Sequence, residues 1–344
     1  MASGGRPTSK DVAQEAGVSQ STVSLVLGGK WEGRVSPATA RCVRDAAARL
    51  GYRPNLAARN LRLGMTRTVL LMVPTLTAPF FGPVYTGAAR VAARHGFGVV
   101  VSTWPDDAVR SADSPFAAPD EAIDGILASS VAVEALGEFR DTPAVMLDSG
   151  PADGAPCGPV PTVDFGVADG MAAIAAHLAA LGHLRYGHVA AGVDQWTFRA
   201  RADALAAAVS ALPGGHLTRA TCAIEVASAR DAAGRLLDAP DPPTVLVCDD
   251  DLIAAGAYKA ARARGLDIPA DLSVTGFDDV LLATALEPEL TTVRLPAEEL
   301  GAQGMALLLD LLSGGSPEPR VLPGELVVRD STAPPARRNR NRPT

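Results

Sequence analysis

The sequence lacks the features of several protein classes. Only 4% of its 344 residues are aromatic, so a core has to be built from Ala, Val and Leu. No run of 18 apolar residues occurs, which excludes a transmembrane helix, and the polar N-terminus has no apolar segment typical of a secretory signal. We therefore expect a cytoplasmic protein. The scattered cysteines predict neither a zinc site nor a disulfide framework: Cys42, Cys157, Cys222 and Cys248.

Motifs of enzymes and metal proteins are also missing. The chain has no phosphate-binding G-x-x-x-x-G-K-[ST] loop, no G-x-G-x-x-G, no H-E-x-x-H and no G-x-S-x-G. Residues 249–251 are three aspartates, but consecutive residues at a strand-to-helix turn point in different directions, and we expect Asp251 to cap the following helix. His177 and His183 have no acidic companions nearby. We predict no metal, no cofactor and no enzyme activity.

Acidic residues outnumber basic ones over the whole chain, but not at its N-terminal end. The net charge of −7 alone argues against nucleic acid binding. Residues 1–65, however, hold ten Lys and Arg against four Asp and Glu, a net charge of +6, and the rest of the chain carries −13. A basic module joined to an acidic body is typical of a protein that meets a polyanion at one end. A basic helical surface that only faces solvent is the alternative.

The basic end has the pattern of two short helices around a tight turn. Thr8 and Asp11 have the spacing of a helix capping box, and Gly17 stands where the first helix would stop. Ser19 can cap a second helix. Two helices that meet across a short Gly-containing turn form a helix-turn-helix. Apolar residues at helical spacing mark the faces expected to turn inward: Val12, Ala13 and Ala16 in the first helix, and Val23, Val26 and Leu27 in the second.

A third helix is predicted to complete this small domain. Ser36 followed by Pro37 is a capping residue with proline in the first turn, and Gly51 ends the pattern after Leu50.

The remainder alternates β-branched apolar runs with Ala-rich helical stretches. Such alternation predicts parallel sheets and the α/β class. The strands are too many for one compact sheet, so we expect two Rossmann-like lobes with a ligand cleft at their strand ends. The expected strands span residues 69–74, 98–103, 125–130, 144–148, 186–192, 244–249 and 272–278. The expected helices span residues 82–96, 167–183, 198–212 and 251–265.

The order of these motifs resembles the lactose-repressor (LacI/GalR) family of bacterial transcription regulators. DVAQEAGVSQSTVSLVL, VSPATARCVRDAAARLGYRPNLAARNLR and the later P-F-F, D-G-I, H-L-x-x-L-G-H and G-F-D-D motifs carry the resemblance, to about Thr332. It implies a helix-turn-helix headpiece and a core similar to periplasmic sugar-binding proteins. A ligand-responsive repressor that binds a pseudo-palindromic operator as a homodimer is the implied function. The alternative is a cytoplasmic sugar-binding protein, or a sugar-modifying enzyme, without DNA readout.

The resemblance assigns roles in DNA binding. Gln20 and Ser21 would face base edges in the major groove, and Thr22 and Ser24 would hold phosphates. Leu25 departs from the family, because many members have Arg there, and leucine offers only apolar contact with a base. This departure leaves the operator sequence open.

A hinge helix is also implied. In the family, two such helices meet in the minor groove and a leucine wedges into the central base step. The matching residues are Asn55, Ala58 and Leu61. An ordinary linker helix is the alternative.

The matched effector positions follow expected strands, except for Arg201, which lies in the expected helix 198–212. They are Pro79, Phe80, Asp148, Arg201, Asp250 and Asp278. Carboxylates and an arginine there suit a polyol or sugar, and Asp250, which is often Asn in the family, makes the cleft more acidic. Trp196 could stack on a sugar face or pack at the lobe edge.

The expected organisation follows from these assignments. The domains are a headpiece (1–54), a hinge and linker (55–65), a two-lobed core (66–332) and a disordered basic tail (333–344). The core's first lobe takes residues 66–164 and 296–322, and its second takes 165–295 and 323–332. The Pro-interrupted segment 105–122 is expected to be irregular. We expect a cytoplasmic, nucleoid-associated protein.

Overall fold

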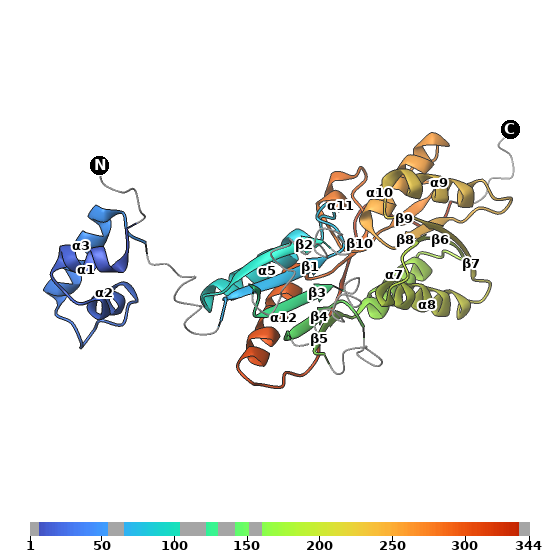
Figure 1. The fold of residues 1–344 in the computed structure, drawn as a ribbon. Coiled ribbons are helices and arrows are strands. Elements are labelled where there is room, and N and C mark those ends of the chain that lie inside the picture. Colours follow the sequence, from blue (N-terminus) through green and yellow to red (C-terminus); the bar gives the residue numbers. More distant parts are fainter. Residues whose placement is uncertain (1–6, 54–64, 104–121, 130–141, 151–159, 337–344) are drawn as a thin grey trace, which may run out of the picture. The chain divides into compact units, whose positions relative to one another are not determined.

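The computed structural model describes residues 7–53, 65–103, 122–129, 142–150 and 160–336. The chain divides into two compact units, residues 1–66 and 67–344 (Figure 1). The three hinge residues and the segment 105–121 lie outside the described residues, as does the tail beyond residue 336. No helix in the described part of the chain has both the length and the apolar character that a membrane span requires.

The first unit is a three-helix domain, here called the headpiece. Its helices are α1 (Ser9–Ala16), α2 (Gln20–Leu27) and α3 (Pro37–Leu50). Thr8 and Asp11 form the predicted capping box, and Gly17 ends α1 in the left-handed conformation that glycine adopts without a Cβ clash. Ser19 and Ser36 cap the next two helices. The headpiece core consists of Val12, Ala13, Val23, Val26, Ala40, Val43, Ala46 and Ala47.

The second unit contains two parallel sheets, which confirms the predicted α/β class. Sheet A has the strand order β11-β5-β4-β3-β1-β2, and sheet B has the order β7-β6-β8-β9. The strands of sheet A are β1 (Thr68–Val73), β2 (Gly98–Thr103), β3 (Gly125–Ser129), β4 (Ala144–Leu147), β5 (Thr162–Phe165) and β11 (Arg320–Leu322). Those of sheet B are β6 (Arg185–Ala191), β7 (His216–Cys222), β8 (Val245–Cys248) and β9 (Ser273–Thr275).

Helices pack on both sheets (Figure 1). Alternate residues of the central strands are buried on opposite faces, as expected for parallel strands covered on both sides. In β8, Val245 and Val247 join one core cluster and Leu246 and Cys248 join another. The helices are α5 (Phe81–Arg94), α7 (Val167–Ala180), α8 (Trp196–Ser210), α9 (Val226–Leu237), α10 (Asp251–Ala263), the short α11 (Leu281–Ala285) and α12 (Ala297–Leu312).

The two lobes exchange chain segments. After β5 of sheet A the chain enters α7 beside sheet B, and it returns through β10 (Thr292–Arg294) to α12. It leaves sheet A again after β11 into β12 (Glu325–Val327), which pairs antiparallel with β10. Both β10 and β12 contact α7. Each lobe is thus assembled from segments far apart in sequence.

Helices α5 and α12 cross at two glycines. A Cβ atom added to Gly87 of α5 would lie 1.8 Å from the carbonyl oxygen of Glu298, and one added to Gly301 of α12 would lie 1.9 Å from that of Val84. The helix backbones therefore approach as closely as they do because neither crossing residue has a side chain.

The seven predicted strands correspond to β1, β2, β3, β4, β6, β8 and β9, and the four predicted helices to α5, α7, α8 and α10. Sequence reasoning missed β5, β7, β10, β11, β12, α9, α11 and α12.

Candidate functional site

The N-terminal end of α2 presents a polar surface on the headpiece. Gln20, Ser21 and Ser24 are exposed there, whereas Leu25 is half-buried. The Thr22 hydroxyl lies 2.9 Å from that of Ser19, the capping residue, so it belongs to the cap of α2. The Ser21 hydroxyl lies 2.7 Å from the same Ser19 hydroxyl, and the exposed side chains of Gln20, Ser21 and Ser24 can still face a partner.

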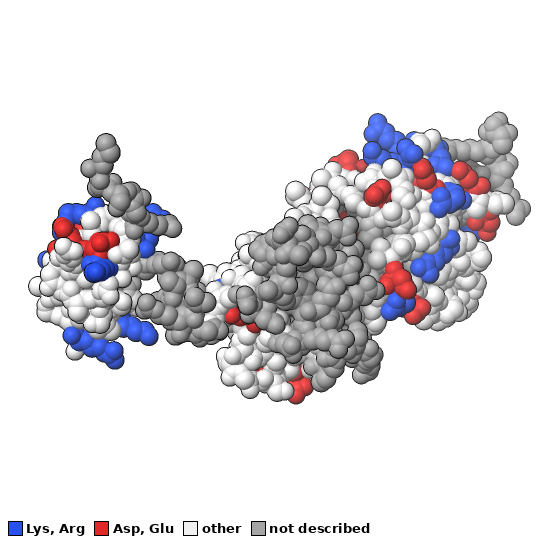
Figure 2. Space-filling view, viewed as in Figure 1, with Lys and Arg blue, Asp and Glu red and all other residues white. Residues whose placement is uncertain are grey.

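Basic side chains surround these helices. Figure 2 shows Lys and Arg on several sides of the headpiece. The exposed ones among the described residues are Lys10, Lys30, Arg34, Arg41, Arg44, Arg49 and Arg53. Arg44 lies over the Trp31 ring, and Arg49 pairs with Glu15 at 3.1 Å. The remaining five, Lys10, Lys30, Arg34, Arg41 and Arg53, can neutralise phosphates.

A cavity of about 300 Å³ lies in the second unit, where the carboxyl ends of strands from both sheets face each other. Ligands of open α/β sheets bind at this edge. Sheet A supplies Ser129 at the end of β3 and Asp148 after β4, and sheet B supplies Asp250 after β8 and Asp278 after β9. Arg201 reaches the cavity from α8.

Arg201 is the central cation of the cavity and is 3% exposed. Its guanidinium donates to the backbone carbonyl of Asp249 and lies 3.5 Å from Asp278 Oδ1. The latter contact is an ion pair rather than a hydrogen bond, because that oxygen has no hydrogen-bond partner. The guanidinium also lies 3.9 Å from the Phe277 ring centroid, a cation–π contact. One face of Arg201 is therefore fixed by the protein.

Three carboxyl groups line the same cavity. Burial raises the pKa of Asp148 to about 7, with Arg201 and a hydrogen bond from Thr197 acting in the opposite direction. Burial likewise raises the pKa of Asp278 well above its usual range and raises that of Asp250. Proton uptake relieves part of the cost of placing several carboxylates around one cation.

Several polar atoms of the lining have no partner. Asp148 Oδ1, Asp278 Oδ1, Ser129 Oγ and Arg201 Nε are all buried and lack a hydrogen bond. Leaving a buried polar atom unpaired costs about 1–3 kcal/mol. The arrangement suits a ligand that supplies donors to the carboxylates and an acceptor to the guanidinium.

Part of the cavity wall is apolar. Pro79, Phe80 and Phe81 line it together with Leu300 of α12. Phe80 contacts Phe81 and Phe165 edge to face, with ring centroids 5.3 and 6.0 Å apart. Such a wall fits the apolar face of a ligand whose polar groups point to Arg201.

Trp196 is not among the lining residues. It packs against Gly150, where an added Cβ would lie 2.4 Å from the indole ring. Of the seven predicted effector residues, the structure brings six to the cavity, and for Trp196 it favours packing.

The three consecutive aspartates have separate partners. Asp249 accepts from His188 at 2.8 Å and from the Ala191 amide. Burial acts to raise the pKa of Asp249, but the interactions with His188 outweigh it, and the pKa is lowered overall. Asp250 caps α10 by accepting from the Leu252 amide. The expectation that Asp251 caps this helix is wrong: α10 begins at Asp251, whose carboxylate turns away from its own helix end.

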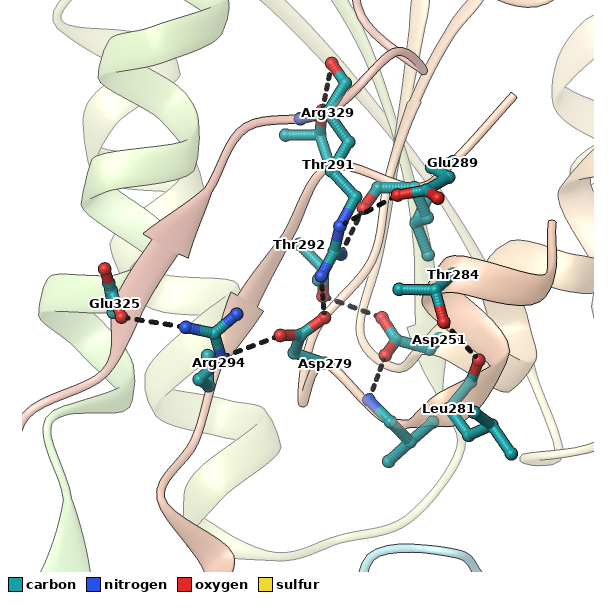
Figure 3. A network of polar contacts seen from close by, with 12 residues as sticks. Asp251, Asp279, Leu281, Thr284, Glu289, Thr291, Thr292, Arg294, Glu325 and Arg329 are labelled. Atoms are coloured by element: carbon teal, nitrogen blue, oxygen red, sulfur yellow. Dashed lines mark hydrogen bonds and ion pairs between the residues drawn. The ribbon is translucent and has the colours of Figure 1, made fainter. Parts of the chain in front are cut away.

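A polar network fixes the loop that carries Asp278 (Figure 3). Asp279 pairs with Arg329 at 2.6 Å and with Arg294 of β10 at 2.8 Å. Asp251 accepts from Thr292 Oγ1 at 2.7 Å and from the Val280 amide at 2.8 Å. The loop is thereby tied to the strand segments that run between the lobes.

This anchoring explains an unusual backbone. Asp278 has φ 103°, outside the regions that residues with a Cβ favour. Its amide donates to Val293 of β10 at 2.8 Å, and its neighbour Asp279 is held by the two arginines. Strand β10 and the network therefore position Asp278 for the cavity.

Other site residues escaped the sequence analysis. Ser129 and Thr197 line the cavity, and Asp164 supports Asp148 by accepting from the amides of Ser149 and Gly150. Single hydroxyl residues carry no spacing signal. Asp164 lies within β5, a short strand that the sequence analysis missed, so no pattern marked it.

Comparison with known proteins agrees with both units. Residues 8–55 match the family described as bacterial regulatory proteins, lacI family. Residues 175–332 match a periplasmic binding protein-like domain.

Relatives extend the similarity over nearly the whole chain. The HTH-type transcriptional repressor CytR of Escherichia coli (strain K12) is 32% identical over 335 residues, which cover 94% of this chain and 96% of the relative. A structure of the lac repressor dimer bound to operator and the anti-inducer ONPF superposes with a TM-score of 0.83 at 25% identity, covering 96% of this chain and 100% of that one.

A third relative is a complex of the transcriptional regulator CelR with cellobiose. It has a TM-score of 0.68 and 29% identity, and the match covers 95% of this chain and 100% of the other. The helix-turn-helix, the two-lobed core and these matches show a DNA-binding transcription regulator rather than an enzyme. The chain belongs to the lacI family of bacterial regulatory proteins.

Proposed function

We propose that this protein is a repressor that binds a pseudo-palindromic operator as a homodimer and responds to a sugar or sugar derivative held between its two lobes. The cavity carries this proposal: its lining holds unpartnered buried acceptors and a fixed guanidinium, in a chain whose other unit is a helix-turn-helix. The operator-bound dimer and the cellobiose complex among the relatives support it.

The proposed DNA reader is the exposed end of α2. Gln20 and Ser21 face base edges, Thr22 and Ser24 hold phosphates, and Leu25 offers a thymine methyl an apolar contact. Each headpiece reads one half of the operator, so two copies of the chain are needed for the full site.

The proposed hinge comprises Asn55, Ala58 and Leu61. Two hinge helices meet in the minor groove, where the leucines wedge into the central base step. We place the hinge and linker at residues 55–65, between a headpiece of residues 1–54 and the core, and the protein in the cytoplasm, associated with the nucleoid.

Leu61→Ala is expected to weaken binding to the selected operator by about tenfold or more, because loss of the wedge removes the DNA bend that specific contacts need. Binding to unrelated DNA depends on phosphate contacts and should change little. Fluorescence anisotropy with both duplexes measures this. An equal loss on both would contradict the wedge.

The proposed effector contacts are Asp148, Arg201, Asp250 and Asp278 for hydroxyl groups, with Pro79 and Phe80 against an apolar face. Closure of the lobes on the ligand changes the geometry of the hinge helices, and the ligand shifts DNA affinity only by its preference for one arrangement, typically about 1–3 kcal/mol.

Selection of bound sequences from a random duplex pool, at fixed near-physiological salt, tests the function directly. An enriched palindrome of about 14–20 base pairs would support a dimeric reader. The selection is repeated with a mixture of sugars, because a ligand required for binding would otherwise hide the result. No enrichment under either condition would contradict the proposal.

Gln20→Ala is expected to cost about 1–3 kcal/mol on the selected operator and to relax selectivity at one base pair in each half-site. Repeating the selection with this variant measures both effects. Gln14→Ala, which changes an exposed residue of α1, is the matched control. A uniform loss over all sequences would mean that Gln20 contacts phosphate instead.

Effector affinity is expected to rise with pH between about 5.5 and 8. The pKa of Asp148 is about 7 in the free cavity because of burial. A ligand hydroxyl that donates to the carboxylate favours the ionised form and lowers this pKa, so binding releases a proton. Burial also raises the pKa values of Asp250 and Asp278, while Arg201 lowers them, so a ligand that donates to these groups should release protons from them as well.

Calorimetry across this pH range measures the effect, and Asp148→Asn should flatten the profile. An affinity that falls as pH rises would contradict the assignment.

A further inference from the structure

The charges around the cavity are unbalanced. Among the described lining residues, Asp148, Asp250 and Asp278 are acidic and Arg201 is the one cation. That cation already pairs with Asp278 and donates to the carbonyl of Asp249. At least two carboxyl groups therefore face the ligand without a cation of their own.

The residues behind the lining do not correct this imbalance. Asp164 accepts from two backbone amides, and Asp251 accepts from an amide and the Thr292 hydroxyl. These donors are neutral. Arg294 and Arg329, the nearest further arginines in the network, are paired with Asp279. The described residues around the cavity thus supply no excess of positive charge, and their negative charge grows as the carboxyl groups, whose pKa values are raised by burial, lose their protons.

The four lining atoms without a hydrogen bond are two carboxyl oxygens, one hydroxyl oxygen and one guanidinium nitrogen, which needs an acceptor. Two of them are the acceptors Asp148 Oδ1 and Asp278 Oδ1. An ionised phosphate or carboxylate offers acceptors only, so beside these oxygens it would meet like charge where they are ionised, and it would gain a hydrogen bond only from a carboxyl group that holds a proton. Hydroxyl and ammonium groups supply donors.

We propose that the cavity selects its effector by charge: it takes a hydroxyl-rich molecule that is neutral or carries an ammonium group, and it rejects phosphorylated and carboxylate derivatives of the same sugars. This inference rests on the proposed sugar-responsive function and narrows the class of molecule that controls the protein.

Matched ligands test the selection on the full chain. The panel comprises ribose and ribose 5-phosphate, together with glucose, glucosamine, glucose 6-phosphate and gluconate, and cellobiose as a further neutral sugar. Thermal shift identifies binders, and calorimetry gives their affinities. We expect any neutral or amino sugar that binds to do so at least roughly 30-fold more tightly than its anionic counterpart, since like charges about 5 Å apart repel strongly in a protein cavity.

Asp250→Asn provides the sharpest variant. Asparagine keeps the size of the side chain and is as good a helix cap as aspartate, so α10 should remain intact. The variant should reduce the ratio of the affinities for neutral and anionic ligands, here called the gap, by at least roughly threefold. Asp203→Asn removes the same charge from the exposed face of α8 and should leave the gap unchanged.

The outcomes separate two kinds of failure. An anionic member that binds as tightly as its neutral counterpart would overturn the charge selection while leaving a sugar-responsive protein. A gap that Asp250→Asn does not narrow would also overturn it. Absence of binding by every member would overturn the selection together with the proposed sugar effector.

Discussion

Arg201→Ala is expected to abolish the response to effector and to lower effector affinity by at least about 100-fold, or about 3 kcal/mol. The guanidinium is buried, pairs with Asp278 and holds the carbonyl of Asp249. Its removal takes away the one cation of the described cavity lining and leaves the acidic groups uncompensated. Calorimetry with the ligand found by thermal shift, and operator binding with and without it, measure the effect.

Two further variants separate binding from folding. Arg201→Lys keeps the charge but loses the planar set of donors, so affinity should fall while the fold persists. Arg199→Ala changes an exposed arginine two residues away, paired on the surface with Asp194, and should behave as the parent protein. Operator affinity without ligand should survive in all three variants, because the headpiece is a separate unit. Effector affinity within threefold of the parent in Arg201→Ala would remove this residue from the site.

Gly301→Val is expected to lower the free energy of unfolding of the second unit by about 3 kcal/mol or more. The new side chain would meet the carbonyl oxygen of Val84, which belongs to a helix backbone and cannot rotate away. Helices α5 and α12 would have to separate, and overpacking of this kind costs about 1–3 kcal/mol even where side chains can adjust. Urea denaturation followed by circular dichroism measures the change.

Gly82→Ala is the matched control for this prediction. Gly82 also lies in α5, but an added Cβ there has nothing within 4 Å. Alanine should stabilise the helix by about 0.5–1 kcal/mol, because the unfolded chain loses flexibility. If both glycine substitutions changed stability in the same direction, the close crossing would not be the cause.

The elements that the sequence predicted are those with strong local patterns. Such patterns are the β-branched apolar runs of β1 and β8 and the Ala-rich stretches of α7 and α10. Strand β7 escaped because its residues, His216–Cys222, are mostly polar and partly exposed at the edge of sheet B. The sequence of helix α12 contains Gly301 and Gly304, which weaken its helical pattern. Both glycines make room for close packing, Gly301 against α5 and Gly304 against Leu147.

The same distinction applies to the site. The resemblance located Asp148, Asp250 and Asp278, whose charges stand out at the ends of strands, and Arg201 in helix α8. It could not locate the support of Asp278, because Asp279 meets Arg294 and Arg329 only once β10 and β12 lie side by side. Contacts between residues 15 and 50 positions apart leave no periodicity in the sequence.

The exchange of segments between the lobes affects the order in which the protein matures on the ribosome. The headpiece has all its helices within the first 50 residues, so it can form early in synthesis. The first lobe needs α12 and β11, which end at residues 312 and 322. Until these emerge, the face of α5 that crosses α12 has no partner. A growing chain therefore carries a finished headpiece long before its second unit exists, and a truncated product would hold the helix-turn-helix without the proposed ligand cavity.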